Sequence, residues 1–172
     1  MKLIMKGYEI ELINYCLRIV INHYKKPFDL NYKSGFFDRY SQISIGKLIT
    51  SRTTDELVEN LKGTEYYAPL KKIKDTDNVT LYDYNLALDL YYYTSTWKEQ
   101  KKILKKSDLE LFMRDRGSKI DLLNIQWIYR AKKYYNMKPA DIYLMLIPIH
   151  YKLSTELVKD LSLIHISEPT RH

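Results

Sequence analysis

The sequence predicts an all-α protein, and three observations carry that prediction. Apolar residues recur every three or four positions along most of the chain, which is the period of an amphipathic helix. Two segments begin with a Thr or Ser followed three positions later by a Glu, the spacing of a helix capping box. No segment shows the sustained alternation of apolar and polar residues that marks a half-buried strand.

The first predicted helix covers residues 8–24. Its apolar positions Ile10, Ile13, Leu17 and Ile21 are spaced by three and four, and Pro27 is expected to end it. Residues 25–40 mix Pro, Asn, Ser and Gly with aromatic residues and have no period of their own. They are therefore interpreted as a packed connecting segment.

Two short helices are predicted next, over residues 43–50 and 53–62. The second carries the sharper signals, because Thr53 and Glu56 have the spacing of a capping box. Gly63 follows at the position where a left-handed residue commonly closes a helix.

The longest helical pattern runs over residues 81–104 and is apolar on two sides. One stripe consists of Leu81, Tyr84, Leu88 and Tyr91, and the other of Leu86, Leu90, Tyr93 and Trp97. A helix of this kind is normally packed between neighbours on both sides.

Three further helices are expected in the C-terminal half. Ser107 and Glu110 repeat the capping-box spacing, Gly117 is expected to close that short helix, and Ser118 is expected to cap the next one, over residues 119–136.

Pro139 suits the first turn of a further helix that runs to about Ile147 and stops before Pro148.

The composition excludes some classes of protein but does not identify the function. The chain has 172 residues, of which 45% are hydrophobic and 28% charged, and it shows no signal-peptide pattern and no long apolar run. This predicts one globular domain or two small ones, neither secreted nor membrane-spanning. The single cysteine, Cys16, cannot form an internal disulfide. The net charge of +7 suits an acidic partner such as nucleic acid, a lipid surface or an acidic protein.

The C-terminal end differs from the rest. Residues 161–171 resemble the translation of a sequencing adapter, so 161–172 are interpreted as an artefactual tail. The helical pattern that begins near Ser154 would then be cut at Asp160, and the chain is expected to be marginally stable and to associate through uncovered apolar residues.

An internal repeat is the second organisational feature. Aligning Arg18 with Arg130 also pairs Glu9 with Asp121, Ile13 with Ile125, Asn14 with Gln126 and Tyr15 with Trp127. The predicted organisation is the end of a first helical repeat in 1–40, a complete repeat in 41–150 and the start of another in 151–160. Two unrelated amphipathic helices can also align this well, so that alternative stays open.

No catalytic, cofactor-binding or metal-binding residue is predicted. The sequence has no phosphate-binding Gly-rich loop and no recognisable nucleophile and base motif. Outside the tail only His23 and His150 remain as histidines, which disfavours a zinc site. The lysine run in 98–106 could bind nucleic acid or lipid, although a basic last turn is also what the helix dipole favours.

Three segments together resemble a known family. They are DELVENLKGTEYY at 55–67, LALDLYYY at 86–93 and DLLNIQWIYRAKKYYNMKPADIYLMLIP at 121–148. In this order they resemble the C subunit of the A/V-type rotary ATPases, which is known as the d subunit in the vacuolar enzyme. The positions taken as the structural family motif are Gly63, Thr64, Tyr66, Leu88, Asp89, Asp121, Asn124, Arg130 and Pro148.

The sequence also departs from the family in two places. Ile149 and His150 stand where two glycines are common, and Asn85 stands where an acidic residue is frequent. The backbone of the loop after Pro148 is therefore expected to differ from that of the family.

The resemblance implies a non-catalytic rotor part without cofactors. It would be a funnel-shaped helical adaptor on the cytoplasmic face of the membrane, where it couples the central shaft to the membrane rotor ring for ion transport without inserting into the bilayer. The competing hypothesis is a basic helical nucleic-acid-binding module, which only the net charge supports. Such a module should gather its Lys and Arg on one face, whereas an adaptor should spread them around a rim.

The motif residues are expected to have structural roles. Asp121 and Asn124 lie one turn apart near the predicted start of their helix, where a carboxylate and an amide can accept from exposed backbone donors. Arg130 is expected near the opposite side, and replacing it with Ala should lower stability or assembly.

Overall fold

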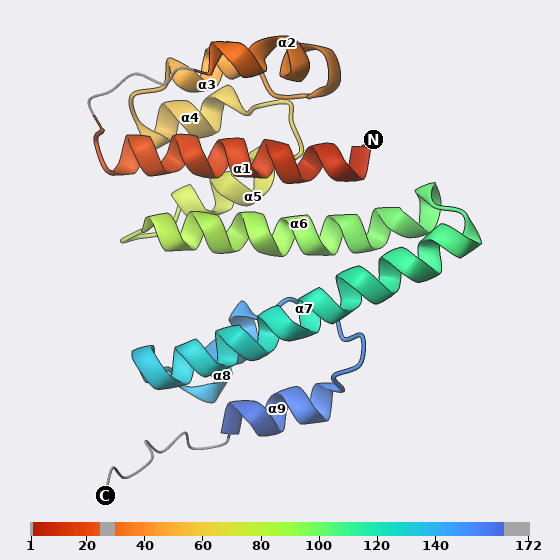
Figure 1. The fold of residues 1–172 in the computed structure, drawn as a ribbon. Helices are drawn as coiled ribbons and strands as arrows, with labels where there is room; N and C mark the ends of the chain where they lie inside the picture. The colour runs from red at the N-terminus through yellow and green to blue at the C-terminus, as the bar shows by residue number, and fades with distance from the viewer. Residues whose placement is uncertain (1, 25–29, 164–172) are drawn as a thin grey trace, which may run out of the picture. The chain divides into compact units, whose positions relative to one another are not determined.

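The structure is a computed structural model that describes residues 2–24 and 30–163, and within them it contains helices and no strand (Figure 1). The all-α prediction is confirmed. The helices are α1 (Lys2–Ile21), α2 (Asn31–Tyr40), α3 (Ile45–Ile49), α4 (Thr54–Asn60), α5 (Tyr67–Lys74), α6 (Leu81–Ile103), α7 (Lys106–Tyr135), α8 (Pro139–Met145) and α9 (Thr155–Leu163).

The chain divides into two compact units. Unit 1 comprises Met1–Tyr92 and unit 2 comprises Tyr93–His172, so the boundary falls inside α6. Each unit has a hydrophobic core of its own. The division follows packing, and the repeat boundaries at residues 40 and 150 stay predictions.

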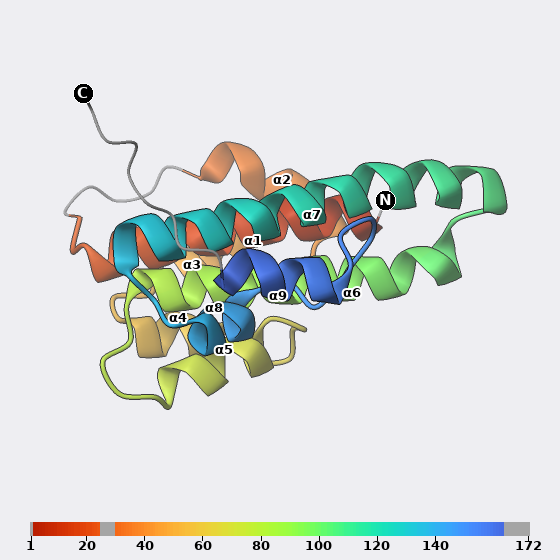
Figure 2. The same cartoon turned by 90° about the horizontal axis from the view of Figure 1, so that it is seen from below.

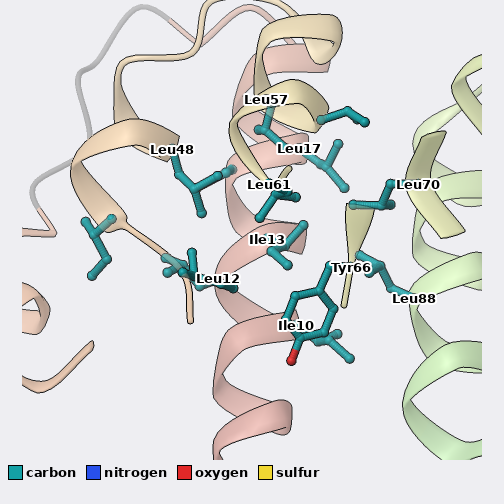
Figure 3. Close-up of a cluster of buried hydrophobic side chains, with 14 of the residues drawn as sticks. Ile10, Leu12, Ile13, Leu17, Leu48, Leu57, Leu61, Tyr66, Leu70 and Leu88 are labelled. Carbon is teal, nitrogen blue, oxygen red and sulfur yellow. The ribbon is translucent and has the colours of Figure 1, made fainter. Parts of the chain in front are cut away.

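Unit 1 is built around α1, which contacts α3 and α4, while α4 also contacts α3 and α5. Two sides of α1 are buried. Leu12 lies on the side of Leu48 in α3, whereas Ile13 and Leu17 lie toward Leu57 of α4 (Figure 3). α1 therefore buries two neighbouring sides, one against α3 and one against α4, and these two helices also contact each other.

The cap predicted at the start of α4 and the left-handed conformation predicted at Gly63 are confirmed. Thr53 is the N-cap, and its Oγ1 accepts a hydrogen bond from the backbone N of Glu56 at 3.2 Å. The Glu56 carboxylate accepts in turn from the backbone N of Arg52 at 2.7 Å, one residue earlier than in the usual capping box. Gly63 has a φ of +88°, the left-handed conformation that glycine adopts without steric cost. It does not close the helix directly, because α4 ends at Asn60 with Leu61 as its C-cap, two residues before Gly63.

The interpretation of 25–40 as a connecting segment is wrong for its second half, which forms α2. Phe37 is buried in the core of unit 1, and the Phe36 ring lies 5.3 Å from the Tyr40 ring, one turn further along the helix. Packing of α2 on α3 stabilises this helix despite the glycine within it. Pro27 lies outside the described residues, and α1 ends before it at Ile21.

α6 matches its predicted range closely. Tyr84 and Leu88 of the first stripe are buried in the core of unit 1. Within unit 2, Tyr93 is buried and the half-buried Trp97 ring meets the Tyr151 ring edge-on at 6.5 Å.

Unit 2 consists of the end of α6 and of α7, α8 and α9. Both α8 and α9 contact α7 and each other, and α9 runs alongside α7 in Figure 1 and in Figure 2. Its core contains Ile128, Ala131, Ile142, Leu146 and Val158. Pro139 occupies the first turn of α8, as predicted.

The prediction of two helices separated at Gly117 is wrong, because α7 continues without a break from Lys106 to Tyr135. Its N-cap is Lys105 without a side-chain cap bond, so Ser107 and Ser118 do not cap helices. Gly117 lies inside the helix, and Tyr151 packs so closely against it that a Cβ at this position would clash with the Tyr151 ring.

Replacing Gly117 with Ala is therefore expected to lower the stability of unit 2 by about 1 to 3 kcal/mol, the usual cost of overpacking. Gly35, which has open space around it in α2, is the matched control. Its replacement should raise stability by about 0.5 to 1 kcal/mol, the normal gain for Ala in a helix interior. Urea unfolding of both variants measures this, and a stabilising Gly117→Ala would contradict the contact with Tyr151.

α9 extends through the first residues of the segment interpreted as an adapter tail. Leu161 packs against the core of unit 2, and the Ser162 hydroxyl donates to the Lys159 carbonyl at 2.6 Å. Residues 164–172 lie outside the described part of the chain.

Candidate functional site

Two buried carboxylates occupy equivalent places in the two units. Glu9 of α1 is 3% exposed and Asp121 of α7 is 7% exposed. A carboxylate removed from water is stable only if hydrogen bonds replace its hydration. Their partners therefore show what each carboxylate does in the fold.

Glu9 holds the loop between α2 and α3. Its Oε1 accepts from the Ser41 hydroxyl at 2.5 Å and from the backbone N of Gln42 at 3.1 Å. Its Oε2 accepts from the Tyr66 hydroxyl. One side chain thus ties α1 to the loop before α3 and to the segment before α5.

Asp121 holds the loop between α8 and α9 in the same way. Its carboxylate accepts from three successive backbone N–H groups: Tyr151 at 3.2 Å, Lys152 at 2.7 Å and Leu153 at 3.2 Å. In both units the acceptor precedes the backbone donors by 30 to 33 residues. The aligned carboxylates therefore have the same function in the two units.

Asn124 reinforces the second anchor. Its amide Nδ2 donates to the Ile147 carbonyl at 3.0 Å, and its Oδ1 accepts from the Ile147 N at 2.9 Å. Pro148 follows directly and is exposed. α7 begins at Lys106, so Asp121 and Asn124 lie near the middle of this helix and not at its start. The backbone N–H groups that they accept from belong to residues 23 to 32 positions later in the chain, not to the first turn of α7. The expectation that they lie near a helix start is therefore wrong.

The Gly63 turn places Tyr66 against Glu9. The Thr64 hydroxyl donates to the Leu61 carbonyl at 2.7 Å and accepts from the Tyr66 backbone N at 3.3 Å. Tyr66 is fully buried, and Leu88 lies beside its ring in Figure 3. Burial, together with the hydrogen bond to the Glu9 carboxylate, raises the pKa of the Tyr66 hydroxyl, so this hydroxyl stays a donor.

A second polar cluster in unit 1 surrounds Glu65. Its carboxylate accepts from the Lys6 Nζ at 2.8 Å, from the Tyr91 hydroxyl at 2.7 Å and from the Gln42 Nε2 at 2.8 Å. Burial alone would raise the pKa of Glu65, but the hydrogen bonds from these partners outweigh it and lower that pKa. Sequence reasoning missed this cluster, although a Lys and a Glu on an otherwise apolar helix face, as at Lys6 and Glu9, were a visible signal.

Acid is expected to destabilise unit 1 through Glu65. Its folded-state pKa lies below its unfolded value of about 4.3, so its contribution to stability is present above that pH. The contribution is lost as the pH falls through the lower folded pKa. Urea unfolding between about pH 3 and pH 6 should show a shallower decline in Glu65→Gln than in the unmodified chain. Glu11→Gln, at an exposed site on α1, should keep the full decline; equal slopes in both variants would contradict the assignment.

The other motif residues do not join either anchor. Asp89 is half-buried on α6, and burial raises the pKa of its carboxyl. Arg130 is exposed and has no hydrogen-bond or ion-pair partner among the described residues. It lies at an open hollow of about 730 Å³ on the surface of α7. This hollow is lined by Gln126, Tyr129, Arg130, Tyr134 and Tyr135.

The position of Arg130 changes the expected effect of its removal. Arg130→Ala should change the free energy of unfolding by no more than about 0.5 kcal/mol, because an exposed side chain without partners leaves nothing unsatisfied. A loss of more than about 1 kcal/mol in urea unfolding would restore the role in stability that the sequence suggested. An effect on assembly remains a prediction.

Several features of the described residues bear on reactivity and on membrane contact. Burial raises the pKa of the Cys16 thiol to about 12, so it is not a thiolate at neutral pH. Among residues 2–24 and 30–163, no three His, Cys, Asp or Glu side chains are grouped as a metal site would require. None of the described helices is both long and apolar enough to span a bilayer. The lysines within 98–106 are exposed around the turn from α6 to α7, whereas Gln100 among them is buried.

The sequence was compared with protein families, curated proteins and solved structures. Residues 1–165 match the family model described as ATP synthase (C/AC39) subunit. Over 117 residues the chain is 31% identical to the C subunit of the A-type ATP synthase of Methanosarcina mazei. This alignment covers 68% of the chain and 31% of that relative, so the chain spans about a third of the relative's length. No solved structure matches significantly.

Proposed function

Since the chain belongs to the ATP synthase (C/AC39) subunit family, we propose that it acts in the central stalk of an A/V-type rotary ATPase. In this role it is a non-catalytic rotor component that couples the central shaft to the membrane rotor ring for ion transport. The family match over residues 1–165 is the observation that carries the proposal.

The internal geometry supports a mechanical role. A part that transmits torque must resist bending, and the continuous helices α6 and α7, of 23 and 30 residues, correspond to lengths of about 35 and 45 Å at about 1.5 Å per residue. Glu9 and Asp121 tie loops between shorter helices to the long helices α1 and α7. Such cross-links limit the sliding of one helix along another.

The proposed location is the cytoplasmic face of the membrane, as a peripheral part of the complex. The proposed partners are the central-shaft subunits and the membrane ring, with no nucleic acid and no cofactor. The proposal needs no titrating or metal-binding group, since coupling depends on contact area and stiffness.

Binding measurements with purified rotor components test the proposal. The chain should be retained by the immobilised shaft subunits or by the detergent-solubilised ring, and Arg130→Ala should weaken retention if the exposed hollow on α7 contributes. A nucleic-acid-binding module would instead bind duplex DNA with an affinity that falls steeply as salt rises. Salt-sensitive DNA binding without retention by either rotor component would favour that alternative.

A further inference from the structure

The two aligned helices, α1 and α7, bury different sets of residues. On α1 one apolar stripe consists of Ile10, Ile13 and Leu17, which are 6%, 0% and 0% exposed. This stripe faces α4 and Tyr66 (Figure 3). It is therefore fully covered within unit 1.

At the aligned positions of α7 the stripe is exposed. Leu122, Ile125 and Tyr129 are 55%, 38% and 41% exposed, and we call these three residues the open face of α7. Leu, Ile and Tyr spaced by three and four form one side of a helix. An apolar side of this kind in water marks an interaction site.

The neighbouring stripe of both helices, about 100° around the helix axis, is buried in the same way. On α7, Asp121, Asn124 and Ile128 are buried where α8 and α9 pack. On α1, Glu9 and Leu12 are buried at the corresponding positions. Helix α9 thus takes the place in unit 2 that α3 has in unit 1, and no described helix of unit 2 takes the place of α4 and α5.

We infer that the open face of α7 is the docking face for a pair of helices of the α4–α5 type. The partner would present an apolar stripe like that of Leu57 and Leu61, both fully buried against α1 in unit 1. It would then turn at a residue in the left-handed conformation, as Gly63 does, and continue into a second helix.

Charge supports this occupant. α4 carries three acidic residues and no basic one within Thr54–Asn60, and all three are exposed. The C-terminal part of α7 next to the open face carries Arg130, Lys132 and Lys133. An acidic first helix therefore suits this end of α7, whereas a second copy of the basic α7 would bring like charges together.

A thiol placed on the open face gives a direct test. Cys16 is fully buried, so Ile125→Cys adds a single reactive thiol, and Leu144→Cys on α8, where Leu144 is 79% exposed, is the matched control. Each variant is made in the full chain and in the full chain extended after His172 by a copy of residues 51–76. The tether gives the copy an effective concentration in the millimolar range.

In the unextended chain both thiols should react rapidly with a soluble disulfide reagent. In the extended chain the Ile125→Cys rate should fall at least about tenfold, while the Leu144→Cys rate should change less than about twofold. Replacing the copy's counterparts of Leu57 and Leu61 by Asp should restore the Ile125→Cys rate. Mutating only the appended copy leaves unit 1 intact, so the loss of protection cannot come from unfolding of the chain.

Three outcomes would overturn the inference. The first is an unchanged Ile125→Cys rate in the extended chain. The second is protection in the unextended chain that rises with protein concentration, which would show that a second copy covers the face. The third is protection in the unextended chain at every concentration, which would show that the chain covers the face itself.

Discussion

Replacing Asp121 with Ala is expected to lower the free energy of unfolding of unit 2 by about 3 to 5 kcal/mol. The side chain accepts hydrogen bonds from three successive backbone N–H groups, of Tyr151, Lys152 and Leu153. A fully buried donor left without a partner costs about 1 to 3 kcal/mol, and because these three bonds are only partly buried, water reduces the sum. Asp121→Asn should be intermediate, since the amide keeps one acceptor oxygen.

Tryptophan fluorescence during urea unfolding measures this effect in unit 2 alone, because both tryptophans of the chain, Trp97 and Trp127, lie there. Asp115→Ala is the matched control, an exposed aspartate on the same helix, and should change stability by no more than about 0.5 kcal/mol. Equal effects of the two substitutions would show that the loop does not depend on Asp121.

Replacing Tyr66 with Ala should cost unit 1 about 3 to 5 kcal/mol, the usual range for removing a large buried aromatic side chain. Tyr66 is fully buried, its ring meets the Tyr91 ring edge-on at 5.9 Å, and its hydroxyl donates to Glu9. Tyr66→Phe keeps the ring and removes the hydroxyl, so it should cost about 1.5 to 3 kcal/mol for the lost bond to a carboxylate.

Amide hydrogen exchange is the suitable measurement for Tyr66, since unit 1 contains no tryptophan. Amides of α1 and α4 should lose protection in Tyr66→Ala, while those of α7 should change less. Tyr24→Ala, at an exposed tyrosine of the same unit, serves as control and should leave protection in α1 and α4 unchanged. Unchanged protection in Tyr66→Ala would contradict the position of Tyr66 in the core.

The sequence by itself determined the features that local rules govern. The all-α class follows from the apolar period, the start of α4 from the Thr53 cap, and the left-handed turn after α4 from Gly63. The start of α8 follows from Pro139, whose fixed φ suits a first turn. The family followed from three ordered motifs, and the match over residues 1–165 confirms it.

Only the tertiary structure decided the rest. The local sequence predicts that Gly117 ends a helix, yet it lies inside α7, where Tyr151, 34 positions later in the sequence, occupies the space that a Cβ would need. Residues 31–40 read as irregular, yet α2 forms because Phe37 is buried in a core made largely by other helices. The helix α5 was not predicted at all.

The anchoring residues show the same limit. Asn124 bonds to the backbone 23 residues away, and Lys6 pairs with Glu65 across 59 residues. Local rules describe residues within about four positions of one another, which is the reach of a helix hydrogen bond and of a cap. The partners of a buried polar group depend on which distant segments the core brings together. A polar residue on an otherwise apolar helix face therefore indicates from the sequence that a buried hydrogen-bonding site exists. Only the tertiary packing identifies the segment to which that residue bonds.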